Sequence, residues 1–190
     1  MMQTKTKEKP IIFSSDSICA IEDGLKTQTR RIVTPQPASN WSIPPALLDQ
    51  GFLNEYGCHR DSDSIKCPWE QEDVLWVREK WHHDGRGGFL YAADNPDFAE
   101  PYENQSWRNP MFMPKAACRL WLQIQAVDIQ RVRDISEEDS IAEGFLSEGE
   151  FSLSAQCKFM HAWDKLNDKR GFDWKSNPWV WVIRFQVHQS

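Results

Sequence analysis

The sequence predicts an α+β fold in which a mostly antiparallel β-sheet closes into a small barrel and carries two or three short helices. Three observations lead to this prediction. The segments with strand character, at about 73–81, 118–132 and 179–187, stand far apart along the chain. The segments with helical periodicity are few and short. The stretches at about 35–70 and 82–113 are polar and without a clear period, so they are expected to be long loop insertions.

The N-terminal part is expected to start as a flexible tail, residues 1–10, followed by a single domain over residues 11–190. Serines and an aspartate that can cap a helix introduce a short helix predicted over Asp16–Asp23, and Gly24 is placed to end it. The segment 26–33 then has threonines at alternate positions and a β-branched end, which is typical of a strand.

Three further segments are predicted to be strands. Segment 73–81 is rich in valine, leucine and tryptophan. Segment 118–132 alternates leucine or isoleucine with tryptophan or glutamine, which indicates a central strand of the sheet. Segment 179–187 begins with a continuous apolar run, which indicates burial on both faces.

Two helices are predicted in the C-terminal half. In "DISEEDSIAEGF", Ser136 and Asp139 form an approximate capping box, and Gly144 is placed to end the helix. A longer helix is predicted near residues 155–168. The residues expected on its buried face are Phe159, Trp163 and Leu166.

Composition narrows the classes of function. The chain has 190 residues and a formal net charge of -6, which argues against broad coating of duplex DNA, since such binding depends on many lysine and arginine contacts to phosphate. Its five cysteines are an odd number and no signal peptide precedes them, so we expect reduced thiols and a cytoplasmic location. No stretch reaches the ~20 apolar residues of a membrane span, and no membrane association is expected.

The stretch "GLKTQTRRIV" concentrates cations in an acidic chain. Lys26, Thr29 and the downstream Glu143 are of the residue types that serve as base, nucleophile and proton donor in amide hydrolases. Arg30 and Arg31 suit phosphate contact, because guanidinium groups match phosphate oxygens in pairs. In the alternative interpretation, Lys26 and Arg31 clamp a phosphate or carboxylate, Glu143 is a structural ion-pair partner, Thr29 is an ordinary strand residue and the arginine pair lies at a solvated strand edge.

Ten tryptophans offer flat surfaces for packing or stacking. Trp76 is a candidate platform for a nucleic-acid base, and Arg78 on the same segment is a candidate phosphate contact. The alternative for each tryptophan is a place in the core. The other candidates for stacking are Trp81, Trp107, Trp121 and Trp181.

Several cysteines and histidines are of the residue types that bind zinc. Their spacing matches no pattern of paired Cys-x-x-Cys or His-x-x-x-His, so we expect no metal site and no cofactor. These residues are Cys58, His59, Cys67, His82 and His83.

Four segments in order resemble the ASCH-domain family, whose members are relatives of the PUA fold with a small β-barrel and a cleft for nucleic acid or nucleosides. The family signature of glycine, lysine, an acidic residue and arginine is similar to Gly24, Lys26, Thr29 and Arg31, with Thr29 in the acidic position. The other three segments are "DVLWVREKW", "RVRDISEEDSIAEGF" and "NPWVWVIRF". Chains with similar segments are commonly encoded in prophages, so the resemblance implies a prophage origin.

One branch of this family is a small bacterial amidohydrolase that removes the acyl group from 4-acetylcytidine. It uses a lysine, a threonine three residues later and a downstream glutamate, to which Lys26, Thr29 and Glu143 are similar. The resemblance implies that Thr29 is the nucleophile, neutral Lys26 its base and Glu143 the proton donor to the exocyclic nitrogen or the group that positions water. The residues expected to hold substrate or phosphate are Gly24, Arg30, Arg31, Trp76 and Arg78.

The expected partner is a modified nucleoside or RNA. Two alternatives stay open beside the hydrolase. In one, the chain is a non-catalytic RNA-binding module in which the same cations only hold phosphate. In the other, it is a phage accessory protein that binds a host protein through its tryptophan-rich insertions. The oligomeric state is not predicted.

Overall fold

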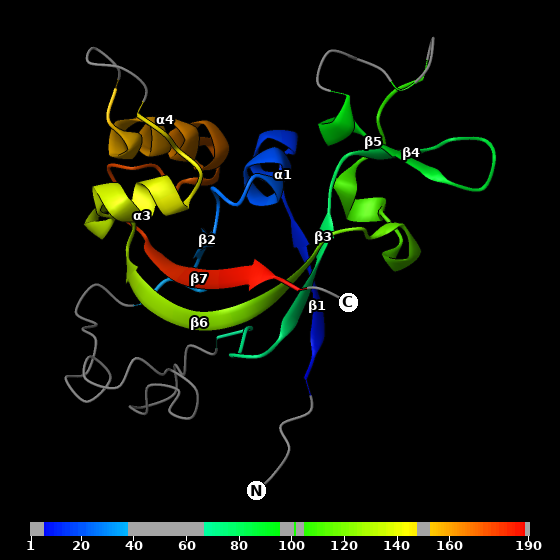
Figure 1. Cartoon of the computed structure of the whole chain (residues 1–190). Coiled ribbons are helices and arrows are strands. Elements are labelled where there is room, and N and C mark those ends of the chain that lie inside the picture. Colours follow the sequence, from blue (N-terminus) through cyan, green and yellow to red (C-terminus); the bar gives the residue numbers. More distant parts are fainter. Residues whose placement is uncertain (1–5, 38–66, 96–100, 102–104, 148–152, 189–190) are drawn as a thin grey trace, which may run out of the picture. The chain divides into compact units, whose positions relative to one another are not determined.

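The computed structural model describes residues 6–37, 67–95, 101, 105–147 and 153–188 (Figure 1). The described residues form both helices and strands, and the predicted α+β class is confirmed. The chain divides into two compact units. The first unit is Met1–Leu25, Glu72–Gln123 and Gln186–Ser190, and the second unit is Lys26–Gln71 and Ile124–Phe185.

Five strands form one sheet in the hydrogen-bonded order β1-β3-β6-β7-β2. Their bounds are Glu8–Ile12 for β1, Gln28–Ile32 for β2, Val74–Arg78 for β3, Trp121–Arg131 for β6 and Trp179–Val187 for β7. β1 is parallel to β3, whereas β3 with β6 and β2 with β7 are antiparallel, so the sheet is mostly antiparallel as predicted. Within the described residues β1 and β2 are the outer strands and do not pair with each other, so the expected closed barrel is not seen.

β1 begins at Glu8, inside the segment 1–10 that the sequence predicts to be a tail. The strand lies along β3 from Glu8 opposite Val74 to the end of the ladder. Asp73 holds its start, because the carboxylate accepts a hydrogen bond from the Lys7 backbone N at 3.2 Å and pairs with the side chain of Lys9. These partners are distant in sequence, so local patterning does not indicate the strand.

Helix α1 spans Ser15–Glu22, close to the predicted Asp16–Asp23. Ser14 is its N-cap and accepts a hydrogen bond from the Ser17 backbone N. Gly24 has a φ of 71°, the left-handed conformation that favours glycine after a helix end. The predicted stop signal is therefore confirmed.

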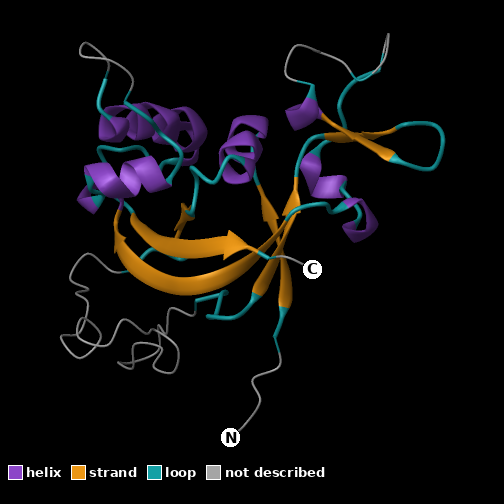
Figure 2. Ribbon diagram, in the orientation of Figure 1, coloured by secondary structure: helices purple, strands orange, loops and turns teal. Residues whose placement is uncertain are grey.

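The predicted strand 73–81 is interrupted, and the region after it is more ordered than expected. β3 ends at Arg78, and β4 (Trp81–His83) starts a separate hairpin with β5 (Phe89–Tyr91), which Figure 2 shows as a pair of short strands. The prediction of an irregular insertion over 82–113 is therefore wrong for the hairpin. Strands of three residues are too short to give a recognisable period.

In the second unit β2 lies along β7, from Gln28 opposite Arg184 to Ile32 opposite Val180. The five residues that begin β7 are all buried, as the continuous apolar run predicts. Helices α3 (Glu137–Ala142) and α4 (Ala155–Asn167) are in contact with each other, and Figure 1 shows them side by side.

The buried face of α4 has a spacing of four residues. Its buried members are Ala155, Phe159, Trp163 and Asn167. Phe159 and Trp163 pack into a core cluster with Val132, Ile135, Val180 and Val182. Leu166 is 72% exposed, so its predicted place on this face is wrong.

A search of the described residues for membrane-spanning segments finds no helix with the length and apolar character that a bilayer crossing needs.

Candidate active site

Lys26 lies between the turn that ends α1 and the start of β2. The chain here runs along the C-terminal end of α3. The Thr27 backbone N donates to the Ala142 carbonyl at 2.8 Å, and Lys26 faces Glu143 in an isolated antiparallel bridge. The backbone therefore brings Lys26 and Glu143 together before any side-chain contact is considered.

Glu143 is held at the C-terminal end of α3. Ser136 caps the helix by accepting a hydrogen bond from the Asp139 backbone N, and the Glu143 backbone N closes the helix by donating to the Asp139 carbonyl at 3.0 Å. Gly144 follows with a φ of 92°. The capping signals read from the sequence thus determine where the Glu143 side chain leaves the helix.

Lys26 and Glu143 form a buried ion pair. The Lys26 Nζ donates to Glu143 Oε2 at 2.7 Å and to the Glu143 backbone carbonyl at 2.8 Å. Lys26 is 5% exposed and Glu143 is 6% exposed. The pair lies within the second unit, at the edge where β2 meets the end of α3.

Arg30 completes a polar network around the same carboxylate. Its Nη1 donates to Glu143 Oε1 at 3.1 Å, and its Nη2 donates to Asp139 Oδ2 at 2.7 Å. With its amide oriented by the groups around it, the Gln130 side-chain oxygen accepts from Arg30 Nη2 at 2.6 Å and from Nε at 3.3 Å. Gln28 adds a hydrogen bond from its side-chain nitrogen to the Asp139 carbonyl at 2.8 Å. Side chains at alternate positions along this strand therefore reach α3.

Burial makes the charged form of Lys26 less stable than it is in water. Burial lowers the pKa of Lys26 from its usual 10.5, because the charged ammonium loses water. The Glu143 carboxylate opposes this effect, and the cations of Arg31 and Arg30 add to it. The net direction is a lowered pKa, which is the condition under which a lysine can act as a base.

Thr29 and Arg31 alternate with Gln28 and Arg30 along β2, so their side chains leave the opposite face of the strand. Thr29 is buried, and among the described residues no hydrogen bond joins its hydroxyl to Lys26 or Glu143. Arg31 is half-buried, and the Glu143 carboxylate acts on it electrostatically. The structure therefore unites Lys26, Arg30 and Glu143 by direct contact but does not join Thr29 to them.

The other predicted binding residues, Gly24, Trp76 and Arg78, belong to the first unit. Trp76 is buried, and the guanidinium of Arg78 lies 4.3 Å from the centre of its ring. Arg78 also donates from Nη1 to the Met111 carbonyl at 3.0 Å. This cation covers a face of the Trp76 ring within the protein.

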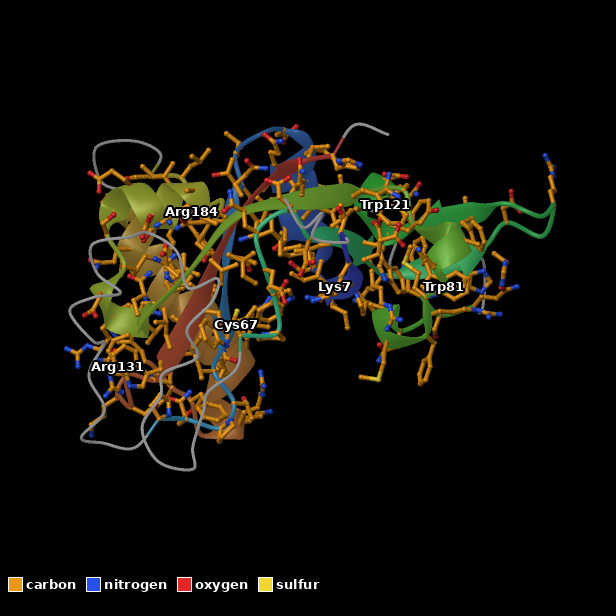
Figure 3. All side chains as sticks on the ribbon, turned by 90° about the horizontal axis from the view of Figure 1, so that it is seen from below. Lys7, Cys67, Trp81, Trp121, Arg131 and Arg184 are labelled. Atoms are coloured by element: carbon orange, nitrogen blue, oxygen red, sulfur yellow. The ribbon has the colours of Figure 1, made fainter. Side chains whose placement is uncertain are left out.

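The remaining stacking candidates differ in burial. Trp81 and Trp181 are buried, and Trp107 and Trp121 are partly buried. Trp81, labelled in Figure 3, packs edge-on against Phe89 with ring centres 5.8 Å apart. For Trp81 and Trp181 the structure supports the alternative of a place in the core.

Three members of the network were not among the predicted site residues: Gln28, Gln130 and Asp139. Asp139 was assigned only to the helix cap. The alternation of Lys26, Gln28 and Arg30 in the sequence is a signal that these side chains share one face. No local signal indicates Gln130, which comes from β6.

The described residues hold no group of three His, Cys, Asp or Glu side chains that could bind a metal ion. The zinc-type candidates Cys58 and His59 lie outside the described residues. Cys67 is described, as are His82 and His83 on β4.

Comparison with known proteins gives two solved structures. No family model matches the chain, and no curated protein matches it. The chain is similar to an ASCH domain from Lactobacillus crispatus JV V101, with 12% sequence identity and a TM-score of 0.43, over 95% of this chain and 79% of that one. It is also similar to the protein EF3133 from Enterococcus faecalis V583, described with the family DUF984, with 10% identity and a TM-score of 0.42, over 100% of this chain and 88% of that one.

Proposed function

We propose that this chain is an ASCH-type protein that binds a modified nucleoside or an RNA base and hydrolyses an acyl amide on the exocyclic nitrogen of cytidine. The observation that carries the proposal is the buried Lys26–Glu143 pair, with Nζ and Oε2 2.7 Å apart and the pKa of Lys26 lowered by burial. The sequence resemblance to the 4-acetylcytidine amidohydrolase branch supplies the substrate class.

A single proton shared by this pair gives both catalytic roles. In the resting state the lysine is an ammonium that donates to the carboxylate. Transfer of that proton from Nζ to Oε2 produces a neutral Lys26, which is a base, and a protonated Glu143, which is an acid. Burial lowers the cost of this transfer because it disfavours the two separate charges.

The reaction follows from these roles. Neutral Lys26 accepts the hydroxyl proton of Thr29 as its oxygen attacks the acyl carbon, and Glu143 donates its proton to the exocyclic nitrogen as the C–N bond breaks. This step leaves an acyl ester on Thr29, free cytidine and the resting ion pair. After a second proton transfer within the pair, Lys26 accepts a proton from water as the water attacks the ester, and Glu143 returns a proton to the Thr29 oxygen. The sum is amide plus water to amine plus carboxylic acid.

The assignment of Thr29 as the nucleophile rests on the sequence resemblance alone, because its side chain leaves the face of β2 opposite to Arg30 and no hydrogen bond joins it to the pair in the described residues. If Thr29 is the nucleophile, rapid quenching followed by mass spectrometry will find an acyl group on the peptide that contains it. If the pair activates water instead, Thr29→Ala keeps most of its turnover and no acyl peptide appears.

The alternative of a phosphate clamp by the same cations has less support. The Nζ of Lys26 and two guanidinium nitrogens of Arg30 already donate to the carboxylates of Glu143 and Asp139. A phosphate at this place would have to displace these carboxylates and would leave their buried charges without partners, which is costly.

The experiment is hydrolysis of 4-acetylcytidine followed by chromatography. The wild-type chain is compared with Lys26→Ala, Thr29→Ala and Glu143→Ala, and with Lys165→Ala, which removes an exposed lysine of α4 as a matched control. The proposal predicts turnover in the wild type and the control, with a loss of at least about 100-fold in Lys26→Ala and Glu143→Ala. Absence of turnover in the wild type at high enzyme concentration would reject this substrate.

A further inference from the structure

We propose that Arg30 is a positioning residue, which fixes the Glu143 carboxylate through Oε1 in the orientation in which Oε2 meets the Nζ of Lys26. The inference rests on the proposed function, because it assigns Arg30 a part in the chemistry of that pair. It also assigns this arginine a different role from the phosphate contact that its sequence position suggests.

Arg30 is buried and held by contacts with several elements. Its side chain is 0% exposed, and its guanidinium donates to Glu143, Asp139 and Gln130. Its central carbon lies 5.7 Å from the centre of the Phe159 ring, on the buried face of α4. Groups from β6, α3 and α4 thus hold the guanidinium at the same time. The guanidinium in turn holds the Glu143 carboxylate in one orientation.

The Glu143 carboxylate needs such support. The last side-chain torsion of a glutamate has a broad distribution without a sharp preferred value. The side chain of Glu143 alone therefore does not determine which of its oxygens faces Lys26. In the structure each carboxylate oxygen of Glu143 has its own partner. Oε1 accepts a hydrogen bond from Arg30 at 3.1 Å, and Oε2 accepts one from Lys26 at 2.7 Å. The two terminal nitrogens of the Arg30 guanidinium, its fork, bind both Glu143 and Asp139, which lie four residues or one helical turn apart.

Arg30 also balances the charge of the network. Lys26 and Arg30 are two cations, and Glu143 and Asp139 are two carboxylates, so the four formal charges cancel. The charged groups that act on Lys26 are Glu143 from the end of α3, and Arg31 and Arg30 from β2. Without Arg30 the carboxylates outnumber the cations in the network, and the proton is held more firmly on Lys26.

The test compares Arg30→Met with the wild-type chain by NMR of ¹³Cε-labelled lysine, in which the Lys26 signal is assigned by its absence from Lys26→Met. Removal of Arg30 is expected to raise the titration midpoint of Lys26. In the hydrolysis assay it is expected to lower kcat on the order of 10- to 100-fold with little change in KM, because the acid and base lose their alignment. On the alkaline side, the pH at which kcat falls to half of its maximum should rise with the Lys26 midpoint, because loss of the shared proton removes the acid.

Arg131→Met is the matched control. Arg131, labelled in Figure 3, lies in the same unit, donates to the Asn177 carbonyl at 3.0 Å and covers the Trp179 ring at 4.3 Å. It contacts neither member of the pair, so the Lys26 midpoint and kcat are expected to stay at the wild-type values. An equal change in this variant would overturn the inference, because it would indicate a general loss of structure.

Arg30→Lys keeps the charge without the fork, and it covers the case in which Arg30→Met does not fold. The inference predicts a Lys26 midpoint near the wild-type value but a kcat that stays below it, because one ammonium cannot hold Glu143, Asp139 and Gln130 together. A full recovery of kcat in Arg30→Lys would overturn the positioning role.

The two proposals fail in different ways. If the wild type hydrolyses 4-acetylcytidine but the Lys26 midpoint does not move in Arg30→Met, the positioning role is overturned and the proposed function stands. If the wild type does not hydrolyse the substrate but the midpoint rises, the proposed function is lost, and the control of the pair by Arg30 is supported.

Discussion

The Nζ of Lys26 lies 2.7 Å from Oε2 of Glu143, although 117 residues separate the two in sequence. Their backbones also face each other in an antiparallel bridge, which holds the two side chains close together. Arg30 supports the carboxylate from its other oxygen. This arrangement gives specific expectations for stability, pH dependence and activity.

Removal of the carboxylate should destabilise the protein strongly. Glu143→Gln leaves the buried Lys26 and Arg30 without the charge that they share, and breaking such a pair from one side costs about 3–5 kcal/mol. Urea unfolding measures the change. Glu138→Gln, which changes an exposed carboxylate of α3, should lower the free energy of unfolding much less. Equal losses of unfolding free energy in the two variants would show that the buried pair stabilises the protein no more than an exposed carboxylate does.

The stability of the protein should depend on pH through Lys26. Its pKa in the folded chain is lowered below the ordinary 10.5, so the unfolded chain binds more protons in the window between these two values. Stability contributed by this group therefore rises with pH across the window and levels off above 10.5. The measurement is the difference in unfolding free energy between the wild type and Lys26→Met from neutral pH to 10.5. A difference that falls with pH would contradict the lowered pKa.

The face of α4 gives a prediction that is independent of the active site. Phe159→Ala opens a cavity in the core cluster and should cost about 3–5 kcal/mol, whereas Leu166→Ala should cost less than about 0.5 kcal/mol because Leu166 is exposed. Chemical denaturation measures both. A large loss of unfolding free energy in Leu166→Ala would indicate that Leu166 lies on the buried face of α4, as the sequence predicts.

Salt separates turnover from phosphate binding. The cations Lys26 and Arg30 are paired with carboxylates, and 4-acetylcytidine is uncharged, so kcat/KM for its hydrolysis should change little between low and high salt. Binding of a short single-stranded RNA that depends on phosphate contacts would weaken steeply over the same range. Fluorescence anisotropy with labelled RNA, beside the hydrolysis assay, compares the two. Steep salt dependence of hydrolysis would favour the phosphate clamp.

Part of the site follows from local sequence signals. Ser136 caps α3, Gly144 ends it, and Glu143 therefore leaves the helix at a predictable place. Gly24 ends α1 just before Lys26 in the same way. Such signals act over a few residues, so they can be read without the fold.

The rest depends on partners that are distant in sequence. Arg30 looks like a phosphate contact in the sequence, because its partners Asp139 and Glu143 come 109 and 113 residues later. β1 and the hairpin of β4 and β5 are short, and β1 is held by Asp73, so their local patterns are weak. Among the described residues, the strand order that places β1 and β2 at the two edges of the sheet is likewise a property of long-range pairing.

The measurement that tests the account most directly is a double-mutant cycle on kcat for 4-acetylcytidine, with Lys26→Met, Glu143→Gln and the double variant. Because one proton passes between the two side chains, the account predicts that either single substitution abolishes most of the rate and that the double variant is hardly slower than either single variant. Losses that multiply in the double variant would contradict a shared proton, and a wild type without turnover would contradict the function itself.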